Sequence, residues 1–242
     1  MDGILITARL KSTRLPGKAL IDVNGKPLLS YLVNRIRSSV EIPVYICTSN
    51  NFQDDPLEKY AVKIGCKCFR GSEEDVLNRY FSCADKYGLD RMYIVYADEP
   101  FIDIELLKKT LSQMDKNKKE WVCNDQYIDG VFGYGFTKLA LEFINKTKDN
   151  NKNEVWGEMV SQMDLNILRN IPSYTADKRN VRLTVDYPED YIVIKKILNH
   201  IGELYKEISV EEFIDVYQKM NLFDINGFRS IEYQQRIKEQ AV

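Results

Sequence analysis

The chain has 242 residues, of which 44% are hydrophobic, and its 34 basic residues nearly balance its 36 acidic ones. This length suits one large α/β domain, and a net charge of −2 excludes a broadly basic nucleic-acid-binding protein. No apolar run is long enough to span a membrane, and the amino terminus does not resemble an export signal. We therefore expect a cytoplasmic protein whose five cysteines are reduced.

An apolar run at residues 3–8 predicts a first strand that is buried on both faces. The loop after it carries five cations against one acid between residues 9 and 26: Arg9, Lys11, Arg14, Lys18 and Lys26. Ser12 adds a hydroxyl group, and Pro16-Gly17 constrains the loop. Cations, hydroxyls and backbone N–H groups at the end of a buried strand favour a polyphosphate ligand over a solvated basic turn.

This basic loop matches neither of the common phosphate-binding motifs. A Walker A loop that ends at Gly17-Lys18 would need glycine in place of Ser12 and Ser or Thr in place of Ala19. A dinucleotide-binding turn would need three spaced glycines. The chain also has one histidine, His200, late in a helical pattern, so we discount a Ser/His or Cys/His nucleophilic mechanism.

Between residues 27 and 103, apolar runs alternate with amphipathic helical patterns. Helices are expected over 28–38, 55–64 and 76–84, and strands over 43–48, 66–69 and 92–96. Ser72 is expected to cap the third helix, with Asp75 completing a capping box. Strands that alternate with helices predict a mainly parallel sheet with helices on both faces.

Past residue 111 the pattern loosens, and we find no repeat and no linker, so we expect one domain over residues 1–242. Strands are expected over 120–124, 127–136, 166–173 and 182–186, and helices over 138–144, 154–163, 187–198 and 210–220. A loop is expected over 146–153, and the polar tail over 231–240 is expected to be peripheral.

Two acidic residues follow predicted strands on the edge of the sheet where the basic loop should lie. Asp98 follows the run 93–97, and Asp186 follows the run 182–185. A carboxylate beside a triphosphate repels it unless a cation intervenes, and Mg²⁺ is the cation that bridges carboxylates and phosphates. For Asp186 the alternative is a place at a helix N-terminus, because Asp-x-Pro-Glu-Asp also suits the start of a helix.

Four segments carry a resemblance to a known family. Ala8-Arg9-x-x-Ser12-Thr13-Arg14-Leu15-Pro16-Gly17-Lys18-x-Leu20 resembles the signature of the CTP-dependent cytidylyltransferases that activate 3-deoxy-2-keto acid sugars, the Kdo and acylneuraminate cytidylyltransferases. Residues 70–80 resemble the spore-coat-polysaccharide (SpsF-like) branch of that family. Residues 98–103 and 184–190 are similar to its two metal-site motifs.

The resemblance implies a three-layer α/β/α, Rossmann-like nucleotidyltransferase fold and a Mg²⁺-dependent enzyme. Such an enzyme joins CTP to an acidic sugar of the 3-deoxy-2-keto type and yields a CMP-sugar and pyrophosphate for surface polysaccharide biosynthesis. Two other functions stay open: transfer from CTP to a phosphorylated polyol or another acid, and a non-catalytic nucleotide-binding subunit of a polysaccharide-synthesis complex.

The same resemblance assigns expected roles to individual residues. Lys18, Arg9 and Arg14 hold the triphosphate and stabilise charge on the leaving group, and Ser12 adds a hydroxyl contact. Asp98 and Asp186 hold Mg²⁺. Ala8, Ser72 and Arg79 lie near the cytosine and ribose.

The segment between residues 120 and 163 is rich in aromatic residues, which usually fill a core or an interface: Trp121, Tyr127, Phe132, Tyr134, Phe136, Phe143 and Trp156. A small satellite core is one explanation. The related cytidylyltransferases form dimers through an arm in this part of the chain. We therefore expect a homodimer built largely from residues 124–163, with the partner's arm near the acceptor-sugar end of the cleft.

Light scattering at micromolar concentration tests this assembly. We predict a mass near twice the 28.2 kDa of one chain. A mass near that of a single chain would contradict the dimer.

Overall fold

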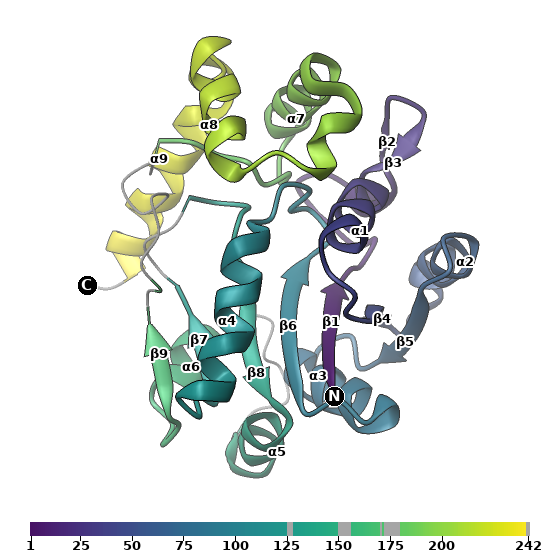
Figure 1. Cartoon of the computed structure of the whole chain (residues 1–242), viewed down its shortest axis with the longest axis vertical. Coiled ribbons are helices and arrows are strands. Elements are labelled where there is room, and N and C mark those ends of the chain that lie inside the picture. The colour runs from purple at the N-terminus through teal and green to yellow at the C-terminus, as the bar shows by residue number, and fades with distance from the viewer. Residues whose placement is uncertain (125–127, 150–155, 170, 172–179, 241–242) are drawn as a thin grey trace.

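A mostly parallel sheet of seven strands runs through the centre of the computed structural model, which describes residues 1–124, 128–149, 156–169, 171 and 180–240 (Figure 1). The strand order is β5-β4-β1-β6-β8-β7-β9. The strands are β1 (Asp2–Thr7), β4 (Val44–Ser49), β5 (Lys67–Gly71), β6 (Arg91–Tyr96), β7 (Trp121–Cys123), β8 (Tyr134–Thr137) and β9 (Ile167–Arg169). A separate hairpin pairs β2 (Asp22–Val23) with β3 (Lys26–Pro27).

The first four of these strands, β5, β4, β1 and β6, pair in parallel, and β8 pairs antiparallel with both β6 and β7. The chain passes from β1 outward to β4 and β5 and then returns to the other side of β1 as β6. The strand order therefore reverses between β1 and β6. Open α/β sheets bind ligands outside the carboxyl ends of the strands at such a switch point.

Helices cover both faces of the sheet, as the sequence pattern predicts. They are α1 (Leu28–Ser39), α2 (Asp55–Lys63), α3 (Val76–Tyr87), α4 (Ile104–Lys116), α5 (Lys138–Thr147), α6 (Gly157–Ser161), α7 (Pro188–Ile201), α8 (Val210–Lys219) and α9 (Phe223–Gln240). Alternate residues of β1 point to opposite faces: Ile4 and Ile6 pack in a core cluster with α1, α2 and α4, and Leu5 packs in another with α3, α5 and α6. This two-sided burial explains the continuous apolar run.

A third core cluster lies beyond the carboxyl ends of the strands, where α7 and α8 pack together with β2 and the first turn of α1 (Figure 1). Arg35 of α1 ties the two parts together. Its buried guanidinium donates to the carbonyl oxygen of Ile102 at 2.8 Å and to those of Tyr205 and Ile208 at 2.7 and 2.9 Å. The carboxyl-terminal helices therefore form one body with the sheet.

The expected strand over 182–186 is wrong. This segment makes one isolated bridge, Asp129 with Arg182, and it crosses the end of the sheet. The Leu183 N–H donates to the Asp129 carbonyl at 2.8 Å, and the Val185 N–H donates to the Asp98 carbonyl at 2.9 Å. The side chains of Leu183 and Val185 are buried against the carboxyl-terminal helices, so the alternating pattern reflects that burial and not a strand.

Other boundaries also differ from the expected ones. Within 128–136, β8 begins only at Tyr134, because residues 128–133 form an irregular segment. The pattern does not predict α4, whose cap is Asp103. Three other expected segments lie partly outside the described residues: the loop over 146–153, the helix over 154–163 and the strand over 166–173. Their described parts contain the end of α5, helix α6 and strand β9, in that order. Tyr127 also lies outside the described residues.

The expected cap of α3 needs correction. Asp75 and not Ser72 caps α3, since its side chain accepts the Asn78 N–H at 3.0 Å, while Ser72 Oγ accepts the Asp75 N–H at 2.9 Å. The tail over 231–240 continues α9, and its described side chains are exposed, as expected of a peripheral segment: Ile231 and Tyr233 are 45% and 46% exposed. Asn226 of α9 is completely buried.

Most of the described aromatic residues between 120 and 163 fill a core of their own chain. Trp156 packs against Phe136 and Tyr134, with ring centroids 5.4 and 4.9 Å apart, and Trp121 stacks on Phe136 at 5.8 Å. Phe143 of α5 is 39% exposed. The core of the main sheet, and not a separate satellite core, therefore accounts for most of these rings, and the dimer stays a prediction.

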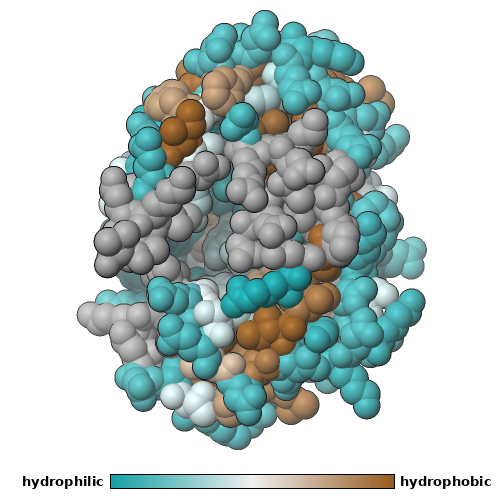
Figure 2. All heavy atoms as spheres, turned by 90° about the vertical axis from the view of Figure 1, so that its left-hand side faces the viewer, coloured by the Kyte–Doolittle hydropathy of each residue, from teal (hydrophilic) through white to brown (hydrophobic). Residues whose placement is uncertain are grey.

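The surface on the side of β9 and α9 is mostly hydrophilic, with smaller hydrophobic areas (Figure 2). None of the helices in the described part of the chain is long and apolar enough to cross a membrane.

Gly130 is the point where the irregular segment meets the crossing segment 182–186. Its φ is +97°, and a Cβ there would lie 2.3 Å from the Thr184 nitrogen and 2.4 Å from the Leu183 carbonyl carbon. Only glycine fits both the left-handed conformation and this close backbone approach.

We predict that Gly130→Ala lowers the free energy of unfolding by about 2 kcal/mol or more, because it adds both strain and a clash with backbone. Urea denaturation measures the loss. Gly157→Ala is the matched control, since a Cβ at Gly157 meets nothing within 4 Å and its φ is ordinary. Equal stability of the two variants would contradict the prediction.

Candidate active site

A cleft of about 710 Å³ opens at the carboxyl ends of β1 and β6, at the switch point of the sheet. Segments far apart in the sequence line it. They are the loop after β1, the first turns of α3, the end of β6, the irregular segment around Gly130 with the first residue of β8, the start of α6, the crossing segment 182–187 and two residues of α9. The fold therefore brings the predicted basic loop and both predicted acids to one place.

Lys18 lines this cleft and lies between its two predicted acids. The loop turns at Gly17, whose φ is +69°, and Lys18 begins the short 3-10 helix Lys18–Leu20. Its Nζ donates to Asp98 Oδ2 and, at 2.7 Å, to Asp186 Oδ1. All three side chains are largely buried, with 15–17% of each exposed. A terminal nitrogen of the Arg14 guanidinium lies 2.9 Å from the same oxygen of Asp186.

The loop is anchored at its other end by a buried acid. The Leu10 N–H donates to Asp54 Oδ1 at 2.7 Å, and the second oxygen of Asp54 accepts a hydrogen bond from Ser49 Oγ at the end of β4. Ser12 Oγ accepts the Leu15 N–H at 3.3 Å. These bonds fix the loop without using the side chains of Arg9 or Arg14.

Charges in the cleft stabilise one another. Burial opposes the charge of the Lys18 ammonium, but Asp98 and Asp186 outweigh it and raise the pKa of Lys18. Burial also opposes ionisation of Asp186, but Lys18, Arg14 and Arg182 outweigh it and lower the pKa of that carboxyl. Burial, together with the charge of Asp98, holds the pKa of Glu99 well above its usual range. Glu99 therefore adds little negative charge to the cleft.

Most of the predicted site residues meet here. The cleft is lined by Ala8, Arg9, Ser12, Arg14, Lys18, Arg79, Asp98 and Asp186. Ser72 lies apart, beside a smaller hollow of about 380 Å³. It reaches the cleft through Arg79, whose guanidinium donates to the Ser72 carbonyl at 2.5 Å and to Thr7 Oγ1 at 3.2 Å.

Asp186 is not a helix cap. The first turn of α7 is closed by Asp190, whose Oδ2 accepts the N–H groups of Asp186 and Tyr187 at 2.9 and 3.0 Å. The Asp186 carboxylate is therefore directed to the cations of the cleft. His200 is exposed on α7 and is not among the residues that line the cleft.

The two carboxylates suit a divalent cation that is shared with phosphate. In the described residues, no group of three or more His, Cys, Asp and Glu side chains could hold a metal by itself. Asp98 and Asp186, however, both contact the one ammonium of Lys18, so their oxygens converge on a single cation. Mg²⁺ is typically held by one or two carboxylates together with substrate phosphates, so the donor set fits.

Several cleft residues carry no recognisable sequence signal. Arg182 lies in a pattern that resembles a strand, Tyr233 lies in the polar tail, and Arg229 lies just before that tail. Tyr134 and Trp156 belong to the aromatic segment. The alternation of polar and apolar residues around Arg182 wrongly predicts a strand, because it arises from burial against the carboxyl-terminal helices.

The raised pKa of Lys18 predicts a pH dependence of stability. A lysine whose pKa is higher in the folded than in the unfolded chain stabilises the protein below the unfolded value, near 10.5, and loses this contribution as the pH rises through the folded value. We therefore expect the difference in unfolding free energy between the wild type and Lys18→Met to be constant around pH 8 and to shrink above about pH 10.5. Urea denaturation across this range measures it. A constant difference up to pH 11 would contradict the assignment.

Comparison with known proteins places this cleft in a family. The cytidylyltransferase family profile matches residues 4–232. The spore coat polysaccharide biosynthesis protein SpsF of Bacillus subtilis is 30% identical over 226 residues, which cover 89% of this chain and 93% of that protein.

Solved structures agree with the sequence relatives. A cytidylyltransferase from Leptospira borgpetersenii superposes with a TM-score of 0.84 at 27% identity, over 93% of this chain and 97% of that one. A CMP:2-keto-3-deoxy-manno-octonic acid synthetase complexed with CTP shares the fold, with a TM-score of 0.64 at 17% identity over 82% and 98% of the two chains. Since the family match spans the basic loop and both cleft carboxylates, the chain belongs to the cytidylyltransferase family and is a nucleotidyltransferase.

Proposed function

We propose that this protein is a Mg²⁺-dependent enzyme of the cytoplasm that transfers CMP from CTP to an acidic sugar of the 3-deoxy-2-keto type. The products are a CMP-sugar for surface polysaccharide biosynthesis and pyrophosphate. The observation that carries the proposal is the convergence of Lys18 with Asp98 and Asp186, next to Arg14, at the switch point of the sheet. Family membership and the CTP-bound structural neighbour support the choice of nucleotide.

The cations of the basic loop bind the triphosphate and neutralise the leaving group. Arg9, Arg14 and Lys18 all line the cleft. Pyrophosphate gains negative charge as it leaves, and fixed cations in a partly buried site stabilise that charge in the transition state. Ser12 adds a hydroxyl contact to the phosphates. Positioning and charge neutralisation thus supply most of the catalysis.

The metal is assigned to the two carboxylates that Lys18 joins. Asp98 and Asp186 would hold Mg²⁺, which when bound shields the α-phosphate and lowers the pKa of the attacking hydroxyl. This division of labour agrees with a cleft that is lined by no histidine among the described residues.

The nucleoside end of the cleft lies against β1 and α3. Ala8 and Arg79 line it, together with Val76 and Tyr80. Arg79 is 4% exposed and is held by Ser72 and Thr7, so its position is fixed before the nucleotide binds. We assign Ala8 and Arg79 to the cytosine and ribose, with Ser72 acting through Arg79.

The other end of the cleft suits a sugar that carries an acid. Tyr134 and Trp156 line it with rings in contact, and aromatic faces pack well against the apolar side of a sugar ring. Arg14 and Arg229 both lie over the ring of Tyr187, at 5.2 and 4.1 Å from its centroid. Arg229, which the triphosphate does not use and which pairs with Glu189 and Glu232, is the arginine that we assign to a substrate carboxylate.

The proposed reaction is tested by measuring pyrophosphate release from CTP, ATP, GTP and UTP with a panel of 3-deoxy-2-keto acid sugars. We expect release with CTP and at least one such sugar, and a CMP-sugar with a single phosphate as the product. If a phosphorylated polyol instead yields a CDP-linked product, the acceptor is that polyol phosphate and not an acidic sugar. Equal turnover with ATP or UTP would contradict the assignment to CTP.

The metal assignment is tested with Asp98→Asn, which keeps the shape of the side chain and removes its charge. We expect turnover at millimolar Mg²⁺ to fall by about 100-fold or more. Even the loss of a residue that only contacts a metal ligand typically lowers metal affinity or activity about 10–100-fold. Asp115→Asn is the control, since Asp115 is exposed on α4 and pairs with Arg91 outside the cleft. A wild-type Mg²⁺ titration curve for Asp98→Asn would remove Asp98 from the site.

A further inference from the structure

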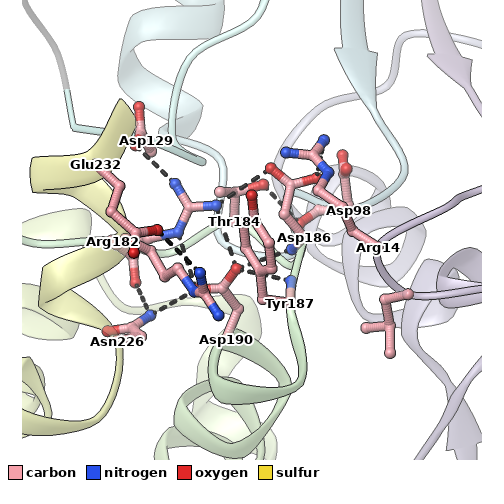
Figure 3. A network of polar contacts seen from close by, with 12 residues as sticks. Arg14, Asp98, Asp129, Arg182, Thr184, Asp186, Tyr187, Asp190, Asn226 and Glu232 are labelled. Atoms are coloured by element: carbon pink, nitrogen blue, oxygen red, sulfur yellow. Dashed lines mark hydrogen bonds and ion pairs between the residues drawn. The ribbon is translucent and has the colours of Figure 1, made fainter. Parts of the chain in front are cut away.

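Arg182 joins three carboxylates at the wall of the cleft (Figure 3). One terminal nitrogen lies 2.8 Å from Asp129 Oδ2, the other lies 3.1 Å from Asp186 Oδ2, and Nε lies 2.9 Å from Asp190 Oδ1. The side chain of Arg182 is 4% exposed, and that of Asp190 is completely buried. A buried guanidinium is therefore saturated by acids, one of which is the proposed metal ligand.

The two oxygens of Asp186 have different partners. Oδ1 contacts Lys18 at 2.7 Å and Arg14 at 2.9 Å, the cations that the proposed function assigns to the triphosphate. Oδ2 contacts Arg182, which stays within the wall of the protein. Arg182 thus holds one oxygen from behind, while the other is directed to the cations of the cleft.

Arg182 is itself held in place from two sides. Asp190 contacts it through both carboxylate oxygens, and Oδ2 of Asp190 also accepts the backbone N–H of Asp186. Asn226 of α9 donates to Asp190 Oδ1 at 2.9 Å and to the Arg182 carbonyl at 3.2 Å. The outermost member is Tyr217 of α8, whose hydroxyl donates to Asn226 Oδ1 at 2.7 Å.

This network is larger than helix capping requires. The first turn of α7 needs only the Asp190 carboxylate on the two backbone N–H groups. A planar fork that meets Asp129, Asp186 and Asp190 at once fixes their relative positions, and lysine cannot reproduce that geometry. Partners behind a metal ligand set its orientation and its affinity for the metal.

We infer that Arg182 is a positioning residue for Asp186, and that Asp190 and Asn226 form a relay that ties the metal site to helix α9. The inference rests on the proposed function, in which Asp186 is a metal ligand. It makes the carboxyl-terminal helices part of the catalytic apparatus, although they contribute no metal ligand.

The test is Arg182→Lys, which keeps the positive charge and loses the fork. Mn²⁺ affinity is measured by electron paramagnetic resonance with CTP present and no acceptor, so the readout does not depend on turnover. We expect the affinity to fall about tenfold or more, with the KM for CTP close to the wild-type value. Turnover at low Mg²⁺ should fall in parallel and recover at high Mg²⁺.

Two further variants separate positioning from stability. Tyr217→Phe removes the outermost bond of the same network and should lower the melting temperature while Mn²⁺ affinity stays at the wild-type value. Asn226→Ala removes three hydrogen bonds, those to Arg182, Asp190 and Tyr217, without a change of charge. It should lower Mn²⁺ affinity by a smaller factor than Arg182→Lys. Asp186→Asn is the positive control, which should lose Mn²⁺ binding.

The outcomes distinguish the inference from the function on which it rests. Wild-type Mn²⁺ affinity in folded Arg182→Lys, with loss in Asp186→Asn, would overturn the positioning role alone. Wild-type affinity in both variants would overturn the proposed metal site. If Arg182→Lys does not fold, Asn226→Ala decides, and wild-type affinity in that variant would overturn the relay.

Discussion

The ammonium of Lys18 lies between the carboxylates of Asp98 and Asp186, which are 80 and 168 residues away along the chain. Largely buried charges of this kind persist only in pairs, because an unpaired carboxylate in such a place costs several kcal/mol. The contact therefore constrains the whole fold: the loop after β1, the end of β6 and the segment before α7 must meet within hydrogen-bonding distance. The sheet supplies the first two at its switch point, and the carboxyl-terminal helices supply the third.

This constraint explains why a chain with a complete sheet also needs α7, α8 and α9. Their core cluster buries Leu183 and Val185, the residues on either side of Thr184, and thereby carries Asp186 across the end of the sheet. Gly130 allows the backbone of this segment to approach closely, and Arg35 joins the third cluster to α1. Stability of the carboxyl-terminal part and geometry of the cleft are therefore two consequences of the same packing.

The amino-terminal half was predictable because its periodicity has a direct physical cause. Ile4 and Ile6 are buried on one face of a strand, and Leu5 is buried on the other. The loop that follows turns at Gly17 and lines the cleft. The later half was less predictable. The segment 182–186 alternates like a strand because its apolar residues face α7 and α8, and Ser72 lies behind Arg79, a relation that no local pattern encodes. Tyr233 belongs to a polar helix whose role depends on where it packs.

In the proposed complex, Asp98 and Asp186 share a cation with the nucleotide when Lys18 and the loop arginines bind its phosphates. The most direct measurement is anomalous diffraction from crystals of the protein with CTP and Mn²⁺. We predict a manganese peak in contact with both carboxylates and with the α-phosphate, and Lys18 in contact with the triphosphate. A manganese peak away from these carboxylates, or Lys18 still joined to both of them with CTP bound, would contradict it.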